Sequence, residues 1–169
     1  LTAEEEKIIS HLLNNFRSSD KLKRHVEFLQ EKGAMYLSYN GNLLIHGCLP
    51  LHENGDFKSF TVNKEAHAGR DLLDFFDQEV RKCLAHPENS TDLATDLMWY
   101  LWVGECSSLF GKTAMTTFER YYIKDKKTHV EKKNPYYQLR EEAEIIRKIL
   151  ENFGLDEGGH LVNGHTPIK

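Results

Sequence analysis

The chain has 169 residues, a formal net charge of −4 at pH 7, and 40% hydrophobic and 28% charged residues. This length suffices for one domain, or a large part of one, with a true hydrophobic core. No apolar stretch approaches the roughly 20 residues that cross a bilayer. Because nucleic-acid-binding domains usually have a basic balance, the charge argues against such a partner. We therefore expect a soluble globular protein with neither nucleic acid nor membrane as its partner.

Cysteine usage and the first residues bear on the compartment. Cys48, Cys83 and Cys106 are an odd number at wide spacing with no C-x-x-C. That pattern is not a disulfide framework, so we expect a reducing, cytoplasmic compartment. Residues 1–6 show neither an initiator Met nor the regions of a signal peptide. We expect the chain to be part of something longer.

Two helices are predicted first. Thr2 and Glu5 form a capping box, and apolar residues then recur at helical spacing, which predicts a helix over residues 3–17. Ser18-Ser19-Asp20 predicts the start of a second helix, with Gly33 as its terminator.

The period then changes to that of strands. Residues 35–39 and 42–46 flank Asn40-Gly41, which predicts a hairpin with a type I′ turn and places His46 at the exit of its second strand. Residues 57–62 are a weaker strand candidate.

A largely helical block follows. Residues 66–85 and 91–103 have helical patterns, the second with Ser90 or Thr91 as its cap. The second pattern is apolar around much of its circumference, which suggests a packed helix within a larger assembly. We expect Trp99 and Trp102 in it to be structural, since aromatic clusters at helical spacing are usually core.

The chain ends with one more helix and one more strand. We expect residues 104–117 to be irregular, and Asn134-Pro135 to begin a helix that Gly154 closes. A short strand over 160–162 then leads to His165. The expected organisation is helices at 1–33, a hairpin and strand at 34–63, a helical cap at 64–153, and a strand with a metal-ligand loop at 154–169.

His46 and His165 are the best candidates for chemistry. Each is expected where a strand turns into a glycine loop, and there an imidazole can face a cleft and hold a metal. The alternative is that each is only a partly buried polar residue. If the two strands are neighbours in one sheet, the helical block is an insertion between them.

Several blocks of unusual composition carry a family resemblance. They are residues 39–50, 98–102, 109–112, 115–121, 132–137 and 163–165. Together they resemble the class III fructose-1,6-bisphosphatase of Gram-positive bacteria, and the likeness runs from the first helix to the last residue. That family belongs to the calcineurin-like metallophosphatases.

The resemblance implies a fold, a reaction and two ligands. The fold would be α+β, part of a calcineurin-like metallophosphatase β-sandwich with a helical insertion. The reaction would be hydrolysis of the 1-phosphate of the sugar bisphosphate fructose 1,6-bisphosphate in gluconeogenesis, with a two-metal manganese site. Carried over from the H-G and G-H-T blocks of the superfamily, the metal ligands here would be His46 and His165.

The chain departs from that superfamily in one large way. The D-x-H, G-D-x-x-D-R-G and G-N-H-[DE] blocks, which supply the other metal ligands and a catalytic histidine, are absent. We therefore expect the catalytic residues in a part that precedes this chain, and an incomplete metal site within it. The chain alone should neither bind manganese tightly nor turn over substrate, because a hard cation prefers several oxygen donors.

Basic residues offer contacts for the second phosphate of the substrate. Lysines cluster between Lys112 and Lys133, so one face could be positive although the chain is acidic. We predict that Lys112 and Arg120 bind substrate, because arginine contacts phosphate bidentately and lysine adds a mobile positive charge. For Lys126, Lys127 and Lys133 a solvated face is the preferred interpretation. Cys48 is expected to be a small buried hydrophobe rather than a ligand or nucleophile.

Two other functions stay open at this point. One is another calcineurin-like phosphatase, acting on dinucleoside polyphosphates or phosphoproteins, for which the final G-H-T-P is equally suitable. The other is a non-enzymatic helical interaction domain in which His46 and His165 are incidental. A homo-oligomer is compatible with the sequence, which does not fix the oligomeric state.

Overall fold

The computed structural model describes residues 1–89 and 91–165. The chain forms two compact units, Leu1–Ala34 and Met35–Lys169. It mixes helices and strands, which confirms the α+β class. No helix in the described ranges is long and apolar enough to cross a bilayer. Ser90, one of the two expected caps, and the Thr166-Pro167 end of the last motif lie outside these residues.

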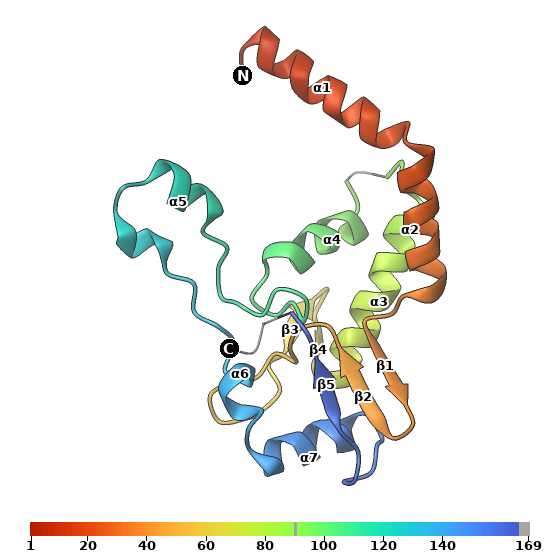
Figure 1. The fold of residues 1–169 in the computed structure, drawn as a ribbon, viewed down its shortest axis with the longest axis vertical. Coiled ribbons are helices and arrows are strands. Elements are labelled where there is room, and N and C mark those ends of the chain that lie inside the picture. The colour runs from red at the N-terminus through yellow and green to blue at the C-terminus, as the bar shows by residue number, and fades with distance from the viewer. Residues whose placement is uncertain (90, 166–169) are drawn as a thin grey trace. The chain divides into compact units, whose positions relative to one another are not determined.

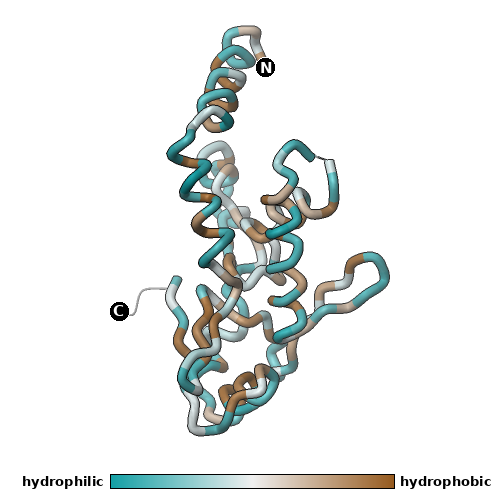
Figure 2. Tube along the Cα trace, turned by 90° about the vertical axis from the view of Figure 1, so that its right-hand side faces the viewer, coloured by the Kyte–Doolittle hydropathy of each residue, from teal (hydrophilic) through white to brown (hydrophobic). Residues whose placement is uncertain are grey.

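The first unit consists of two helices, as predicted. Helix α1 spans Ala3–Arg17 and has the expected capping box, in which the Thr2 amide donates to Glu5 at 2.6 Å. Helix α2 spans Asp20–Lys32, with Ser19 as its N-cap and Gly33 as its C-cap. Short hydrophobic stretches alternate with hydrophilic ones along both helices (Figure 2). Both helices are described in full and neither buries a residue.

The second unit is built on a three-stranded sheet of order β1-β2-β5 (Figure 1). Strands β1 (Tyr36–Tyr39) and β2 (Asn42–Ile45) form the predicted hairpin. Asn40 and Gly41 have φ of 50° and 75°, as a type I′ turn requires. Strand β5 (Leu161–Asn163) runs parallel to β2, with Ile45 opposite Asn163. The two strands that precede the histidines are therefore neighbours in one sheet, as the insertion hypothesis needs.

A second hairpin was only half predicted. Strand β3 is Phe60–Val62, shorter than the expected 57–62, and it pairs with β4, Glu65–His67. The prediction of a helix from residue 66 was therefore wrong at its start, because residues 65–67 complete a ladder.

Helices make up most of the chain between β4 and β5. They are α3 (Gly69–Ala85), α4 (Leu93–Val103), α5 (Thr117–Tyr122), the 3₁₀ helix η1 (Lys126–His129), α6 (Tyr136–Leu139) and α7 (Ala143–Asn152). The cap of α4 is Asp92, not Thr91, because the Asp92 carboxylate accepts from the Thr95 amide at 2.9 Å. The single helix expected from Asn134 to Gly154 is two helices, with Glu142 in an extended conformation between them.

The core of the second unit lies between the sheet and helices α3, α4, α6 and α7. Its largest fully buried apolar side chains are Leu43, Leu49, Leu51, Leu72, Leu73, Phe76, Tyr136, Ile149 and Leu150. Burying such a side chain stabilises the fold by roughly 1.5–3 kcal/mol, so this cluster holds β2 against the helices that follow it in sequence.

The prediction that Trp99 and Trp102 are core was wrong. Their exposed fractions are 66% and 67%, whereas Leu97 and Leu101 of the same helix are buried. The core-facing stripe of α4 is made of Ala94, Leu97 and Leu101 at helical spacing. The two indole rings lie on the other side of that helix.

Candidate functional site

The two candidate histidines meet in the structure although 119 residues separate them. His46 Nε2 lies 3.0 Å from His165 Nδ1. The two rings are 5.0 Å apart between centroids and inclined by 67°. Both residues are exposed, so the paired nitrogens can be reached from solvent.

Parallel strand ends bring these histidines together, and backbone contacts fix them. The Gly164 amide donates to the His46 carbonyl at 3.0 Å. The Asn163 side-chain amide donates to the Gly47 carbonyl at 3.2 Å. Gly47 must be glycine here, because a Cβ on it would lie 2.6 Å from the Ser108 carbonyl oxygen.

Asn163 is itself held from the helical side of the fold. Its side-chain oxygen accepts from the Tyr136 hydroxyl at 3.1 Å. Tyr136 is fully buried, and burial raises the pKa of its phenol, so this hydroxyl stays a donor. The position of the histidine pair is thus coupled to the first turn of α6. The sequence motifs did not reveal this role, since it arises from a contact between two segments that are not neighbours in sequence.

His165 has an unusual backbone and an unusual proton affinity. Its φ is 63°, in the left-handed region that few non-glycine residues adopt. Partial burial is the first cause of its lowered pKa, and the charges of His46, Lys112 and Lys133 lower it further. A lowered pKa keeps this imidazole neutral at neutral pH, which is the form that ligates metals.

The histidine pair has too few neighbours to complete a metal site within the described residues. No group of three or more His, Cys, Asp and Glu side chains that could hold a metal occurs among them. Within the described residues, the two imidazoles alone therefore do not make up a metal site. His160, which directly precedes β5, instead contacts Asn42, whose side-chain oxygen accepts from the His160 backbone amide at 3.0 Å and lies 3.1 Å from its Nδ1.

The predicted substrate contacts Lys112 and Arg120 both lie beside Glu131. The Lys112 ammonium is 2.7 Å from the Glu131 carboxylate, and the Arg120 guanidinium is 3.9 Å from it. The hydrogen bond from Lys112 and that from the Thr116 amide lower the pKa of Glu131 to about 2. Arg120 also donates to the Thr116 hydroxyl and to the His129 carbonyl, each at 3.0 Å. Sequence analysis did not single out Glu131, the carboxylate that contacts both Lys112 and Arg120.

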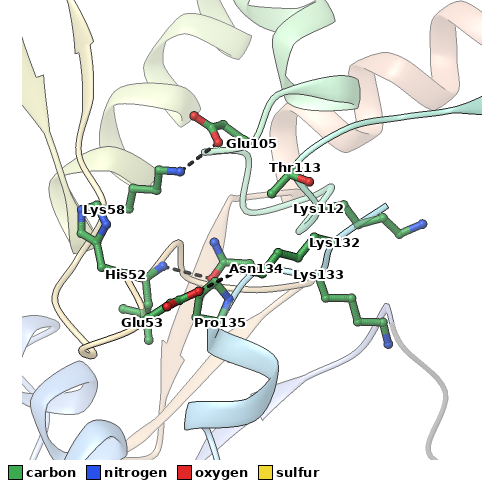
Figure 3. Close-up of a pocket in the computed structure, with 11 residues that line it drawn as sticks. His52, Glu53, Lys58, Glu105, Lys112, Thr113, Lys132, Lys133, Asn134 and Pro135 are labelled. Atoms are coloured by element: carbon green, nitrogen blue, oxygen red, sulfur yellow. Dashed lines mark hydrogen bonds and ion pairs between the residues drawn. The ribbon is translucent and has the colours of Figure 1, made fainter. Parts of the chain in front are cut away.

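A cavity of about 170 Å³ opens beside Lys112 (Figure 3). Its charged side chains are Lys58, Lys112, Lys132, Lys133, Glu53 and Glu105. Lys58 pairs with Glu105 at 2.9 Å, and Lys132 pairs with Glu53 at 2.8 Å. The lining has more cationic than anionic groups, which agrees with the positive face expected from the lysine cluster.

Cys48 is a buried structural residue, as expected. Its side chain is fully buried, and burial raises the pKa of its thiol to about 12. A thiol in that state is neither a nucleophile nor a ready ligand at neutral pH.

Comparison with known proteins decides the family. A family model described as Firmicute fructose-1,6-bisphosphatase matches residues 1–169. The chain belongs to this family. The resemblance carried by the sequence blocks is therefore confirmed.

Curated relatives agree with this assignment to the fructose-1,6-bisphosphatases. The chain is 89% identical over 169 residues to a fructose-1,6-bisphosphatase class 3 of Lactococcus lactis subsp. cremoris strain MG1363. It is 57% identical over 169 residues to that of Streptococcus agalactiae serotype V and 56% identical over 170 residues to that of Bacillus velezensis. Each match covers all of this chain but 26% of the relative. The chain thus spans about a quarter of their length. No solved structure matches it.

Proposed function

We propose that this chain is part of an enzyme that hydrolyses fructose 1,6-bisphosphate to fructose 6-phosphate and phosphate, in the cytoplasm and in gluconeogenesis. The single observation that carries this proposal is the family match over all 169 residues. The contact between His46 and His165 supports it, since the two histidines implied as ligands by the resemblance are brought together by the fold.

His46 and His165 would hold a divalent cation, which we propose to be manganese. Their nearest ring nitrogens lie 3.0 Å apart, so both imidazoles would be close enough to hold the same cation. Cations in a two-metal site neutralise phosphoryl oxygens and acidify the attacking water. The remaining ligands, and the catalytic residues, are proposed to lie in the part of the protein that this chain does not include.

Metal binding sets requirements on the protonation and orientation of the two histidines. Each must present an unprotonated nitrogen, because a ligand must be free of its proton before a metal binds. The lowered pKa of His165 supports that role near neutral pH. The bonds that Asn163 and Gly164 make to the His46–Gly47 segment keep both rings in place.

Lys112 and Arg120 are proposed to bind the second phosphate of the substrate, the one that is not hydrolysed. The side chains of Lys112 and Arg120 share the single carboxylate of Glu131, so these three side chains together keep a positive charge. Arg120 is half-exposed, and its guanidinium is oriented by Thr116 and His129. A fixed guanidinium is suited to phosphate oxygens.

A calcineurin-like β-sandwich is proposed for the complete fold. Leu37, Leu44 and Val162 are direct neighbours across β1, β2 and β5, and their exposed fractions are 54%, 37% and 52%. An apolar row across one face of a sheet favours a second layer upon it. We propose that the rest of the polypeptide supplies that layer. A homo-oligomer stays a prediction.

The test is a phosphatase assay of the longest polypeptide encoded by the reading frame that contains these residues. We expect manganese-dependent phosphate release from fructose 1,6-bisphosphate, with little from a dinucleoside tetraphosphate or a phosphoserine peptide. His46→Ala and His165→Ala should each lower activity by roughly 100-fold or more. His160→Ala is the matched control, because that histidine lies on the same strand region but contacts Asn42. Hydrolysis of the other substrates alone would overturn the proposal.

A further inference from the structure

Two lysines lie directly opposite each other where the segments around residues 112 and 133 pair. Lys112 and Lys133 form an antiparallel bridge. The flanking hydrogen bonds run from the Thr113 amide to the Lys132 carbonyl and from the Asn134 amide to the Gly111 carbonyl. Lys112 and Lys133 are therefore a non-hydrogen-bonded pair, the cross-strand arrangement in which side chains on one face lie closest.

Like charges in such a pair repel, and only one of these two is neutralised. Lys112 has Glu131 at 2.7 Å. Lys133 has no carboxylate within ion-pair distance among the described residues, and its ammonium lies 5.5 Å from the centre of the Tyr137 ring. Its neighbour Lys132 is paired with Glu53. The uncompensated charge at Lys133 thus contrasts with the paired lysines around it.

Both side chains lie on the same side of the cavity. Figure 3 shows Lys112 and Lys133 extending away from Lys58 and Glu105, in directions that diverge. A Cβ on Gly111, the residue before Lys112, would lie 3.2 Å from the Cys48 sulfur, so the start of this pairing lies against the segment that follows His46. Two ammonium groups on one face beside a proposed phosphatase centre can hold a dianion between them, which would remove their repulsion.

We propose that Lys112 and Lys133 form a clamp for the phosphate of the sugar bisphosphate that does not react. This inference rests on the proposed function, in which the histidine pair and its metals take the reacting phosphate. A protonated lysine has no lone pair for a metal, so the two lysines would bind phosphate oxygens directly and not as ligands of the cations. Lys133 then distinguishes a bisphosphate from a monophosphate, whereas sequence analysis favoured a solvated role for it.

The experiment compares two substrates in the longest encoded polypeptide. In Lys133→Gln, the Michaelis constant for fructose 1,6-bisphosphate should rise roughly tenfold or more, the usual effect of losing a charged hydrogen bond. The kcat/KM for fructose 1-phosphate, which lacks the second phosphate, should stay within about twofold. Lys133→Arg should retain most of the affinity for the bisphosphate. Lys132→Gln is the matched control and should leave the Michaelis constant and kcat/KM unchanged for both substrates.

Each other outcome has a defined meaning. If kcat/KM falls equally for both substrates in Lys133→Gln, Lys133 does not discriminate the second phosphate. If kcat/KM changes for neither substrate, Lys133 is a solvated lysine. Either result would overturn the clamp. If the unaltered protein does not hydrolyse the bisphosphate, the proposed function fails, and calorimetric titration with inorganic phosphate tests the clamp by itself. Binding that is roughly tenfold weaker in Lys133→Gln would still support the clamp as a phosphate site, and unchanged binding would end it.

Discussion

The Asn134 side chain joins two segments that are far apart in sequence, and its truncation should be costly. Asn134 has an exposed fraction of 5%, and its side-chain oxygen accepts from the Leu51 amide at 3.1 Å and the Tyr136 amide at 3.0 Å. Asn134→Ala leaves both donors without this acceptor in the interior. At about 1–3 kcal/mol for each unsatisfied buried donor, the free energy of unfolding should fall by about 2–6 kcal/mol. That is a large fraction of the roughly 5–15 kcal/mol that a domain possesses.

Urea unfolding followed by circular dichroism measures this loss. Asn134→Asp is the control, because it keeps an acceptor oxygen at the same position, and the negative charge that it adds is hydrogen-bonded by the same two backbone donors. Its destabilisation should be smaller than that of Asn134→Ala by at least about 1 kcal/mol. If the two variants unfold at the same urea concentration with the same slope, the acceptor role assigned to Asn134 is wrong.

Two further predictions concern the manganese affinity of the chain and the pH dependence of its stability. The 169-residue chain by itself should show no micromolar affinity for manganese and no phosphate release, because its described residues group fewer than three metal-ligating side chains; calorimetric titration and a phosphate assay check this, and micromolar binding would contradict it. The pKa of Glu131 is lowered to about 2, first by its hydrogen bond from Lys112. A lowered folded pKa contributes stability above the ordinary value of 4.5 that is lost as the pH falls towards 2. Glu131→Gln should therefore be less stable than the unaltered chain at pH 7, with a difference that shrinks between pH 4.5 and pH 2; a constant difference would refute the ion pair's contribution.

Local signals were enough for the parts of the fold that position the histidines. Asn40-Gly41 dictates a hairpin, since both residues accept positive φ, and that turn fixes the register that puts His46 at the strand exit. The pairing of β2 with β5 could only be stated as a condition, because parallel neighbours are distant in sequence and no local pattern specifies them. Asn163, Tyr136 and Glu131 were missed for the same reason: their roles arise from contacts between distant segments.

The errors have identifiable physical causes. Strand β4 was missed because its turn is Asn63-Lys64, with φ of 51° and 72°, and lysine is not a residue that signals positive φ. The buried face of α4 could not be chosen because the helix is apolar around much of its circumference, so the aromatic cluster favoured Trp99 and Trp102 while the fold buries Leu97 and Leu101. Nothing in residues 139–142 marks the break between α6 and α7, which carries no glycine or proline.

The distance between the two histidines depends on how the whole second unit packs, and not only on contacts at the site itself. Parallel strands need a crossover, and here residues 46–160 form it, so β5 reaches β2 only after the intervening helices have packed. Tyr136 connects the core to the site, because it is fully buried at the start of α6 and its hydroxyl donates to the Asn163 side chain at the end of β5. If the two histidines hold one cation as proposed, the pair tolerates little displacement. Core changes near Tyr136 should therefore weaken metal binding by the complete protein before they unfold it, because the helical block that separates the histidines in sequence also packs against the strands that bring them together.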